Sequence, residues 1–310
     1  MPWYVILALC LGGLAIVLTF VTSWIIARSM YHPPRLTLPQ TREKENERTP
    51  DLLALFDTWD RTGYVIRSRY GYSLQCYFFP NPNKHPEKPS PLIIIAHGYT
   101  YSHYGSIKYA YLMRRHGFDV VMFDQRYHAG SGGKTCSLGF YESKDLETVI
   151  DDAQNRFGVD RLGVYGESMG AVSALLEQAS DSRIRFVVAD CPFADLRFLV
   201  TGLIRRRYGL PRFPFVPLAD WFFRLATGIP FSSVRPIDAV KKAVCPILFI
   251  HGSDDAFVPS KHSQMLYEAC PSPKTLYLAG NGARHAEAFR KNRENYTAVL
   301  DRFLSEHRLV

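Results

Sequence analysis

The sequence begins with a long apolar run. Residues 3–27 contain no charged side chain, and a helix needs about 20 apolar residues to cross a bilayer. A cleaved signal peptide would have a basic start, a shorter apolar stretch and a small-residue cleavage site. Met1-Pro2 brings no basic side chain, and Ala27-Arg28 makes a poor cleavage site. The pattern therefore predicts a retained transmembrane anchor over residues 3–27.

The next segment, residues 28–50, is polar and charged and contains the pair Pro33-Pro34. This composition is typical of a tether between an anchor and a domain. From residue 51 the pattern becomes globular, and the remaining length is enough for one large α/β domain with a single core. We therefore expect a tether over 28–50 and one domain over 51–310.

Short apolar runs recur through this domain. Residues 63–68 and 73–79 flank the turn Tyr70-Gly71-Tyr72 and predict an antiparallel hairpin. The later runs are rich in β-branched side chains, which suits strands that are buried on both faces of a parallel sheet. These predicted strands are 92–96, 119–124, 161–165, 186–190, 246–250 and 274–278.

Helical patterns lie between the predicted strands. Ser143 can cap a helix whose apolar positions Leu146, Val149, Ile150 and Ala153 keep helical spacing. A last helix is expected over 286–306. Strand and helix alternating in this way predict an α/β fold with a doubly wound, mostly parallel sheet.

Residues 192–244 interrupt the alternation, because they separate two strands by more than a short connection and one helix. This insert is rich in aromatic and basic side chains, among them Arg205, Arg206, Arg207 and Trp221. It predicts a small helical cap over one end of the sheet. We expect its Phe and Trp side chains to face acyl groups bound at the site.

The motif Gly166-Glu167-Ser168-Met169-Gly170 follows the predicted strand that ends at Tyr165 and precedes a helical pattern. The pattern G-x-S-x-G between strand and helix is typical of a nucleophile elbow. There a serine occupies a strained turn, and side chains at the two glycine positions would collide with neighbouring elements. Ser168 is therefore the candidate nucleophile.

An acid and a base should follow the serine in the order Ser, Asp or Glu, His. Asp255 and His285 follow two successive predicted strands, and sites in open α/β sheets form at the carboxyl ends of strands. In these roles His285 takes the serine proton and Asp255 orients the imidazole. Asp190 and Asp254 remain alternatives for the acid.

The loop after the first core strand carries His97-Gly98-Tyr99. We expect the backbone N–H groups of Tyr99 and Met169 to form an oxyanion hole. His97 precedes Ser168 in the chain, so it is expected to order this loop rather than act as the base. His128 and His251 are expected to be structural.

Other functions find little support. Gly132-Gly133-Lys134-Thr135 resembles the end of a phosphate-binding loop, but the full motif needs glycine where His128 stands. No zinc-protease motif or comparable ligand cluster occurs, so we expect neither a metal nor a cofactor. The net charge is +8 without a recognisable nucleic-acid-binding motif. We therefore expect the excess charge to form a solvated surface, with an anionic bilayer surface as the alternative. The six cysteines form no C-x-x-C pair and are expected to be free thiols.

Taken together, the motifs within about residues 55–305 resemble a bacterial α/β-hydrolase family of the YqkD type. This family is grouped with serine aminopeptidase-like (S33) and monoacylglycerol-lipase-like hydrolases. The resemblance implies Ser168 as nucleophile, Asp255 as acid, His285 as base, and Tyr99 and Met169 as oxyanion donors. The motifs that carry it are His97-Gly98-Tyr99, Phe123-Asp124-Gln125-Arg126, Gly130-Ser131-Gly132-Gly133-Lys134, Gly166–Gly170, Ala189-Asp190-Cys191-Pro192-Phe193, His251–Pro259 and His285. One departure is Tyr127-His128-Ala129, where the family more often has Gly-His-Gly or Arg-His-Gly.

Three functions are compatible with these residues. The first is an esterase for acyl or lipid-like substrates, which the aromatic cap and the anchor favour. The second is an S33-type peptidase or amidase, which would need an acidic anchor for the substrate ammonium although the cap is basic. The third is a non-catalytic binding protein, which the intact motif set disfavours. Fold membership alone does not choose among them.

The side of the membrane on which the domain lies follows from the charges that flank the anchor. Arg28, Arg35, Arg42 and Lys44 follow the apolar run, while only the α-amino group precedes it. The positive-inside rule therefore favours a cytoplasmic catalytic domain, and free thiols agree with a reducing compartment. The family that this sequence resembles, however, includes exported members.

Overall fold

The computed structural model describes residues 1–82, 90–159 and 161–309. Its centre is an eight-stranded sheet in the order β1-β2-β4-β3-β5-β6-β7-β8. The first two strands form an antiparallel hairpin that joins β4 antiparallel, and the other neighbouring pairs are parallel. The strands are β1 Thr62–Arg67, β2 Ser73–Phe79, β3 Leu92–Ala96, β4 Asp119–Phe123, β5 Leu162–Glu167, β6 Ile184–Asp190, β7 Ile247–Gly252 and β8 Lys274–Ala279. The predicted hairpin, the strands and the α/β class are confirmed.

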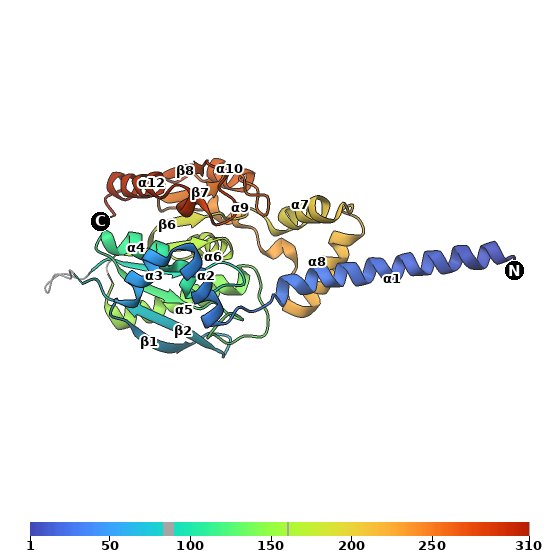
Figure 1. The fold of residues 1–310 in the computed structure, drawn as a ribbon, viewed down its shortest axis with the longest axis horizontal. Helices are drawn as coiled ribbons and strands as arrows, with labels where there is room; N and C mark the ends of the chain where they lie inside the picture. The colour runs from blue at the N-terminus through green and yellow to red at the C-terminus, as the bar shows by residue number, and fades with distance from the viewer. Residues whose placement is uncertain (83–89, 160, 310) are drawn as a thin grey trace.

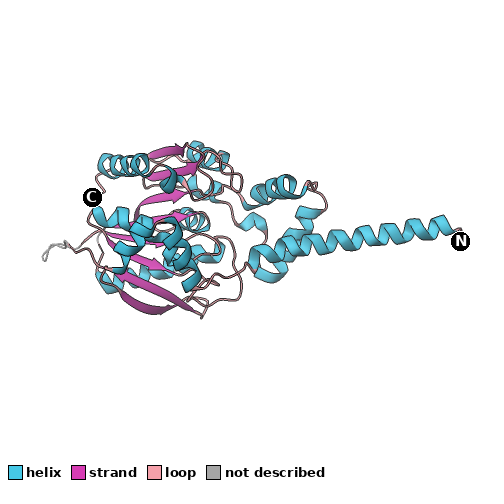
Figure 2. Cartoon of the chain, viewed as in Figure 1, coloured by secondary structure: helices cyan, strands magenta, loops and turns pink. Residues whose placement is uncertain are grey.

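Helices cover both faces of this sheet (Figure 2). Alternate side chains of the buried strands enter different apolar clusters, with Ile94 on one face and Ile93 on the other. On the Ile94 face, the helices that contribute buried side chains are α5 Phe140–Phe157, α6 Met169–Glu177, α9 Pro236–Val240 and α10 Lys261–Ala269. On the Ile93 face they are α3 Pro50–Asp57, α4 Ile107–Arg115, α11 Ala288–Lys291 and α12 Arg293–Glu306. This two-sided burial explains the unbroken apolar strands.

Two predicted helix boundaries are wrong. Helix α5 starts at Phe140, so Ser143 lies inside it, and Glu142 accepts hydrogen bonds from the N–H groups of Ser137 and Gly139 at 2.8 and 2.9 Å. The single last helix predicted over 286–306 is divided into α11 and α12. The division falls at Asn292, whose side chain accepts a hydrogen bond from the N–H of Asn295 and caps α12.

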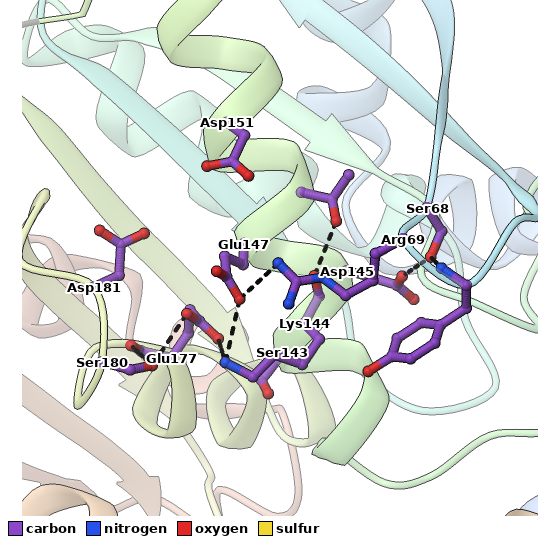
Figure 3. A network of polar contacts seen from close by, with 12 residues as sticks. Ser68, Arg69, Ser143, Lys144, Asp145, Glu147, Asp151, Glu177, Ser180 and Asp181 are labelled. Atoms are coloured by element: carbon purple, nitrogen blue, oxygen red, sulfur yellow. Dashed lines mark hydrogen bonds and ion pairs between the residues drawn. The ribbon is translucent and has the colours of Figure 1, made fainter.

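A polar network ties α5 to the neighbouring elements (Figure 3). Lys144 bonds Glu177 of α6 at 3.1 Å and Glu147 at 3.2 Å, and Arg69 bonds Glu147 at 3.0 Å. Ser68, at the end of β1, donates to the buried carboxylate of Asp145 at 2.5 Å. The hairpin is therefore fastened to α5 by polar contacts as well as by the apolar core.

The N-terminal helix α1 spans Trp3–Tyr31 and is long and apolar enough to cross a membrane. It extends away from the sheet, and its C-terminal part packs along α8 (Figure 1). Its most apolar stretch is exposed, whereas Ile26, Ala27 and Tyr31 are buried. The helix therefore runs past residue 27, where the predicted anchor ends.

The segment predicted to be a tether, residues 28–50, contains the end of α1 and a helix α2 over Leu38–Arg48. Thr37 and Gln40 form a capping box at the start of α2. Thr41 and Glu45 are buried, and the Thr41 hydroxyl contacts that of Ser102 at 2.7 Å. Much of this polar segment is therefore part of the folded domain.

The insert 192–244 forms helices α7 Leu196–Tyr208 and α8 Phe215–Thr227, a short turn of helix η2 over Phe231–Ser233, and α9. Helices α7 and α8 lie beyond one end of the sheet, near the C-terminal part of α1 (Figure 1). Their buried side chains share one apolar cluster with the end of α1 and with Met169. The insert is thus a helical cap whose core reaches the elbow.

Candidate active site

Ser168 occupies a sharp turn between β5 and α6. Its backbone has φ 52° and ψ −112°, in a region that is unusual for a residue with a side chain. A Cβ at Gly166 would lie 2.4 Å from the backbone of Ala171, and one at Gly170 would lie 2.1 Å from the carbonyl oxygen of Ala96. The predicted collisions at both glycines are therefore confirmed, and they explain why the turn needs glycine on either side of Ser168.

The structure brings Ser168, His285 and Asp255 into one hydrogen-bonded chain. The Ser168 hydroxyl lies 2.9 Å from Nε2 of His285, and Nδ1 of His285 lies 2.6 Å from Oδ2 of Asp255. Asp255 follows β7 and His285 follows β8, so both residues come from loops at carboxyl ends of strands. Because an ionised carboxylate can only accept, Nδ1 carries the proton and Nε2 is free to accept the serine proton.

Asp255 is held as a carboxylate. Burial alone would raise its pKa, but hydrogen bonds from His251 and His285 outweigh burial and keep the pKa well below its ordinary value. Its Oδ1 also accepts the N–H groups of Phe257 and Val258 at 2.9 and 2.8 Å. The carboxylate therefore stays charged and fixed in orientation beside His285.

The two alternative acids lie in other surroundings. Asp254 accepts a hydrogen bond from Ser253 at 3.2 Å. Asp190 is buried, accepts a hydrogen bond from Tyr296 at 2.8 Å, and lies 3.0 Å from the Tyr109 hydroxyl. Burial and then the charge of Glu167 raise the pKa of Asp190. Of the three candidates, Asp255 is the one that contacts the imidazole of His285.

Two buried histidines hold the loop that carries Tyr99. Nε2 of His97 accepts the Gln125 N–H at 2.9 Å, so Nδ1 donates to the carbonyl oxygen of Gly98 at 2.7 Å. Nε2 of His128 likewise accepts the Thr100 N–H at 3.1 Å. Burial lowers the pKa of both histidines, to about 4 for His97. Both histidines are therefore neutral and hold the loop backbone by hydrogen bonds, which agrees with the expected structural roles.

An ion pair lies under the elbow. Nζ of Lys108 is 2.5 Å from Oε2 of Glu167, and the Tyr109 hydroxyl donates to the same oxygen at 2.6 Å. Burial would raise the pKa of Glu167, but the charge of Lys108 and the hydrogen bonds from Lys108 and Tyr109 together outweigh burial and lower it. Glu167 is therefore an ionised neighbour of Ser168, with two donors on its Oε2.

Two cavities of different character meet at Ser168. The first has a volume of about 430 Å³ and is mostly apolar, with Met169 and the cap residues Leu199, Val200, Leu203 and Ile204 in its wall. The second, of about 330 Å³, is lined by charged side chains and by His285. Ser168 and Tyr99 line both cavities, while His285 lines the charged one.

The expectation that cap Phe and Trp side chains face the site holds for Phe193, which lines the apolar cavity, and is wrong for Trp221 and Phe213, which do not line it. Trp221 is 50% exposed and Phe213 is 77% exposed, and the cap presents mainly aliphatic side chains to the apolar cavity. The α7 residues that line the cavity recur at helical spacing, so one face of α7 is turned toward the cavity. Trp221 and Phe213 lie outside the cavity wall.

Several lining residues carry no signal in the sequence. Lys44, Glu45 and Arg48 of α2 line the charged cavity, although they belong to the segment predicted as a tether. Ile26 and Met30 of α1 line the apolar cavity. Their positions depend on long-range packing, which periodicity along the chain does not encode.

Among the described residues, no group of three or more His, Cys, Asp or Glu side chains could hold a metal ion. The six cysteines, all within the described ranges, are unpaired, and five of them are buried.

A family model described as the alpha/beta hydrolase fold matches residues 91–214. YqkD of Bacillus subtilis, an uncharacterized protein, is 38% identical over 266 residues, covering 84% of this chain and 85% of that protein. The predicted YqkD-type resemblance is confirmed, while the S33 grouping stays a prediction.

Solved structures give the same fold. The Pyrococcus furiosus esterase Pf2001 aligns with a TM-score of 0.69 at 23% identity, covering 89% of this chain and 98% of the esterase. Est1E of Butyrivibrio proteoclasticus, solved with ferulic acid bound, aligns with a TM-score of 0.65 at 23% identity, covering 79% and 98%. At this identity the likeness establishes the architecture and leaves the substrate open.

Proposed function

The chain belongs to the α/β-hydrolase fold family, and we propose that it is a serine hydrolase that cleaves carboxylic esters of acyl or lipid-like substrates. The observation that carries the proposal is the hydrogen-bonded chain from Ser168 through His285 to Asp255. Ser168, at the start of this chain of hydrogen bonds, lies where an apolar and a charged cavity meet. The arrangement provides a nucleophile, a base and separate places for the two halves of an ester.

In the first half of the reaction, Oγ of Ser168 attacks the ester carbonyl carbon while its proton passes to Nε2 of His285. The carbonyl oxygen becomes an oxyanion, which the N–H groups of Tyr99 and Met169 would stabilise. The carbon–oxygen bond to the alcohol then breaks, and His285 gives its proton to the departing oxygen. The alcohol leaves, and the acyl group stays bound to Ser168.

In the second half, His285 removes a proton from water, and the resulting hydroxide attacks the acyl carbon. The bond to Ser168 breaks, Oγ regains a proton from His285, and a carboxylic acid leaves. Asp255 keeps its negative charge throughout, since hydrogen bonds hold its pKa low. It orients the imidazole and stabilises the imidazolium that forms in each half.

The two cavities suggest which half of the ester goes where. The leaving alcohol must lie beside His285, which protonates it, and His285 lines the charged cavity. The acyl group must lie beside Ser168 on the other side, where the lining is aliphatic. An ester of an apolar acid with a polar alcohol fits this arrangement.

Peptidase chemistry fits the charged cavity less well. An aminopeptidase needs a carboxylate to hold the substrate ammonium, but the carboxylates in this cavity already have partners. Glu45 accepts a hydrogen bond from Tyr101 at 2.8 Å, Glu167 pairs with Lys108 at 2.5 Å, and Glu287 pairs with Arg290 at 2.6 Å. Ester hydrolysis is therefore the activity we propose.

The test compares matched esters and amides on the purified full-length protein in detergent. p-Nitrophenyl esters with acyl chains from acetyl to palmitoyl should be hydrolysed, and the p-nitroanilides of the same acids should be cleaved far more slowly. Amino-acid p-nitroanilides with a free ammonium group serve as peptidase substrates. Turnover of these last compounds above that of every ester would contradict the proposal and favour the peptidase.

We further propose that α1 spans a membrane with the catalytic domain on its cytoplasmic side. Arg28, Arg35, Arg42 and Lys44 follow the apolar stretch and favour this orientation, and the unpaired cysteines fit a reducing compartment. Protease treatment of intact cells tests it, because release of the domain from outside would show the opposite orientation.

A further inference from the structure

The apolar cavity beside Ser168 has a wall that comes from the N-terminal helix. Ile26, Ser29 and Met30, in the last two turns of α1, line this cavity together with Ser168 and the cap helix α7. These positions are three and four residues apart, so they lie on one face of the helix. One face of α1 therefore looks toward the space beside the nucleophile.

This end of α1 is built into the core of the site. Ile26, Ala27 and Tyr31 are buried in the same apolar cluster as Met169, next to Ser168, and Leu199 of the cap. Phe20 and Tyr31 make ring contacts with Phe222 and Phe223 of α8. The cap thus holds the helix along its C-terminal third.

Polar contacts fix the same end to the loops around the elbow. The Tyr99 hydroxyl donates a hydrogen bond to the carbonyl oxygen of Ser29 and lies 3.3 Å from that of Met30. The N–H of Cys136 donates to the carbonyl oxygen of Tyr31 at 2.9 Å. These bonds, with the ring contacts, keep Ile26 and Met30 in place as a rigid surface.

The remainder of α1 has a different environment. No residue of its most apolar stretch is buried, and the N-terminal part of the helix projects away from the domain (Figure 1). One continuous helix thus joins an apolar span to the wall of a cavity that opens at Ser168. A simple anchor needs only the first of these parts.

We propose that the last two turns of α1 form a binding surface for the acyl chain of the ester, so that the membrane helix selects substrates by acyl-chain length. The occupant is a single hydrocarbon chain, since the cavity wall combines Ile26, Met30 and aliphatic cap residues. The proposal rests on the esterase function proposed above. It assigns to α1 a role in substrate binding in addition to membrane attachment.

Crosslinking from a bound acyl analogue gives the direct test. The probe is a p-nitrophenyl alkylphosphonate whose alkyl chain carries a diazirine at mid-chain in one version and near the end in another. Ser168 Oγ attacks phosphorus and displaces p-nitrophenolate, which leaves the alkyl chain in the position of an acyl group. After illumination, proteolysis and mass spectrometry, we expect a crosslink to residues 26–30 from at least one version.

The outcomes of this test separate the two proposals. Labelling of Ser168 with crosslinks confined to the cap or the core domain would overturn the role of α1 and leave the hydrolase intact. Failure of the phosphonate to label Ser168 at all would instead contradict the proposed function. The full-length wild-type protein is used, so the result does not depend on a variant's folding.

A substitution gives a second measurement. Met30→Trp, in the cavity wall, should lower the ratio of kcat/KM for the palmitoyl ester to kcat/KM for the butyryl ester about tenfold, because a larger side chain overpacks the space that the longer acyl chain fills. Ile25→Trp is the matched control, since Ile25 belongs to the same helical turns, is 54% exposed and does not line the cavity. Equal losses on both esters in Met30→Trp, or the same chain-length shift in Ile25→Trp, would refute the proposal.

Discussion

The side-chain hydroxyl of Tyr99 donates a hydrogen bond to the backbone carbonyl oxygen of Ser29, 70 residues earlier in the chain. Tyr99 belongs to the loop expected to supply an oxyanion donor, and Ser29 belongs to the last turns of the apolar helix α1. The loop backbone is separately braced by His128, through the Thr100 N–H. A hydrogen bond therefore connects the end of α1 to the loop beside Ser168.

Tyr99→Phe tests the catalytic importance of this link. The backbone N–H at position 99 remains, so only the positioning of the loop is weakened. A single hydrogen bond contributes about 0.5–1.5 kcal/mol, so kcat for a short acyl ester should fall about two- to tenfold. Tyr70→Phe, at a 43% exposed tyrosine, is the control and should keep wild-type kcat. Wild-type kcat in Tyr99→Phe would show that the link is dispensable.

The identity of the acid is tested by three asparagine variants. Asp255→Asn should lower kcat about 10⁴-fold, because the amide no longer sets the His285 tautomer. Asp254→Asn and Asp190→Asn should each lower kcat by far less, since both carboxylates bond other partners. Steady-state ester hydrolysis by folded protein is the assay. A larger loss in Asp190→Asn than in Asp255→Asn would place the acid one strand earlier.

The elbow glycines give a stability prediction. Gly170→Ala would place a Cβ 2.1 Å from the backbone oxygen of Ala96, so the turn or β3 must shift, at a cost of about 1–3 kcal/mol or more. The melting temperature and the rate of phosphonate labelling should both fall. Gly63→Ala is the control, because its Cβ would meet its nearest neighbour at an ordinary 3.8 Å. Similar melting temperatures for the two variants would contradict the close packing at the elbow.

Asp145 predicts a pH dependence of stability. Burial raises the pKa of its carboxyl to about 6, from an ordinary value of 3.8. Between these two values the folded protein binds more protons than the unfolded chain, so the free energy of unfolding falls as pH rises through this window. Asp145→Asn removes this contribution. The difference in unfolding free energy between wild type and variant should therefore change by about 3 kcal/mol across the window, and a difference independent of pH would contradict the shift.

The sequence predicts the central architecture because local pattern and global fold agree there. The buried strands are short runs with no polar face, and the elbow has a steric reason for each glycine, so both can be recognised from neighbouring residues. The order of strands leads to His285 and to an acid among Asp190, Asp254 and Asp255, since parallel strands bring their carboxyl ends to one edge. Within this set the family resemblance favours Asp255, the carboxylate that contacts His285 in the structure. Long-range contact is not needed to find any of these residues.

The N-terminal region could not be predicted in the same way. The sequence of an apolar helix is the same whether its last turns contact lipid or line a cavity. The burial of Ile26 and Tyr31 could therefore not be predicted from the sequence. The charged segment that becomes α2 resembles a linker because its buried residues, Thr41 and Glu45, are polar. Their burial is stabilised by hydrogen bonds to Ser102 and Tyr101, which lie far away in the chain.

The most direct test of the account is the covalent reactivity of Ser168. Intact-mass spectrometry after treatment with a p-nitrophenyl alkylphosphonate should show one adduct on the wild-type protein, with the modified peptide containing Ser168. Ser168→Ala, with an unchanged melting temperature, should show no adduct and should lower kcat for ester hydrolysis about 10⁴- to 10⁶-fold. Adduct formation or ester turnover at the wild-type rate in Ser168→Ala would contradict the proposal that this protein is a serine hydrolase.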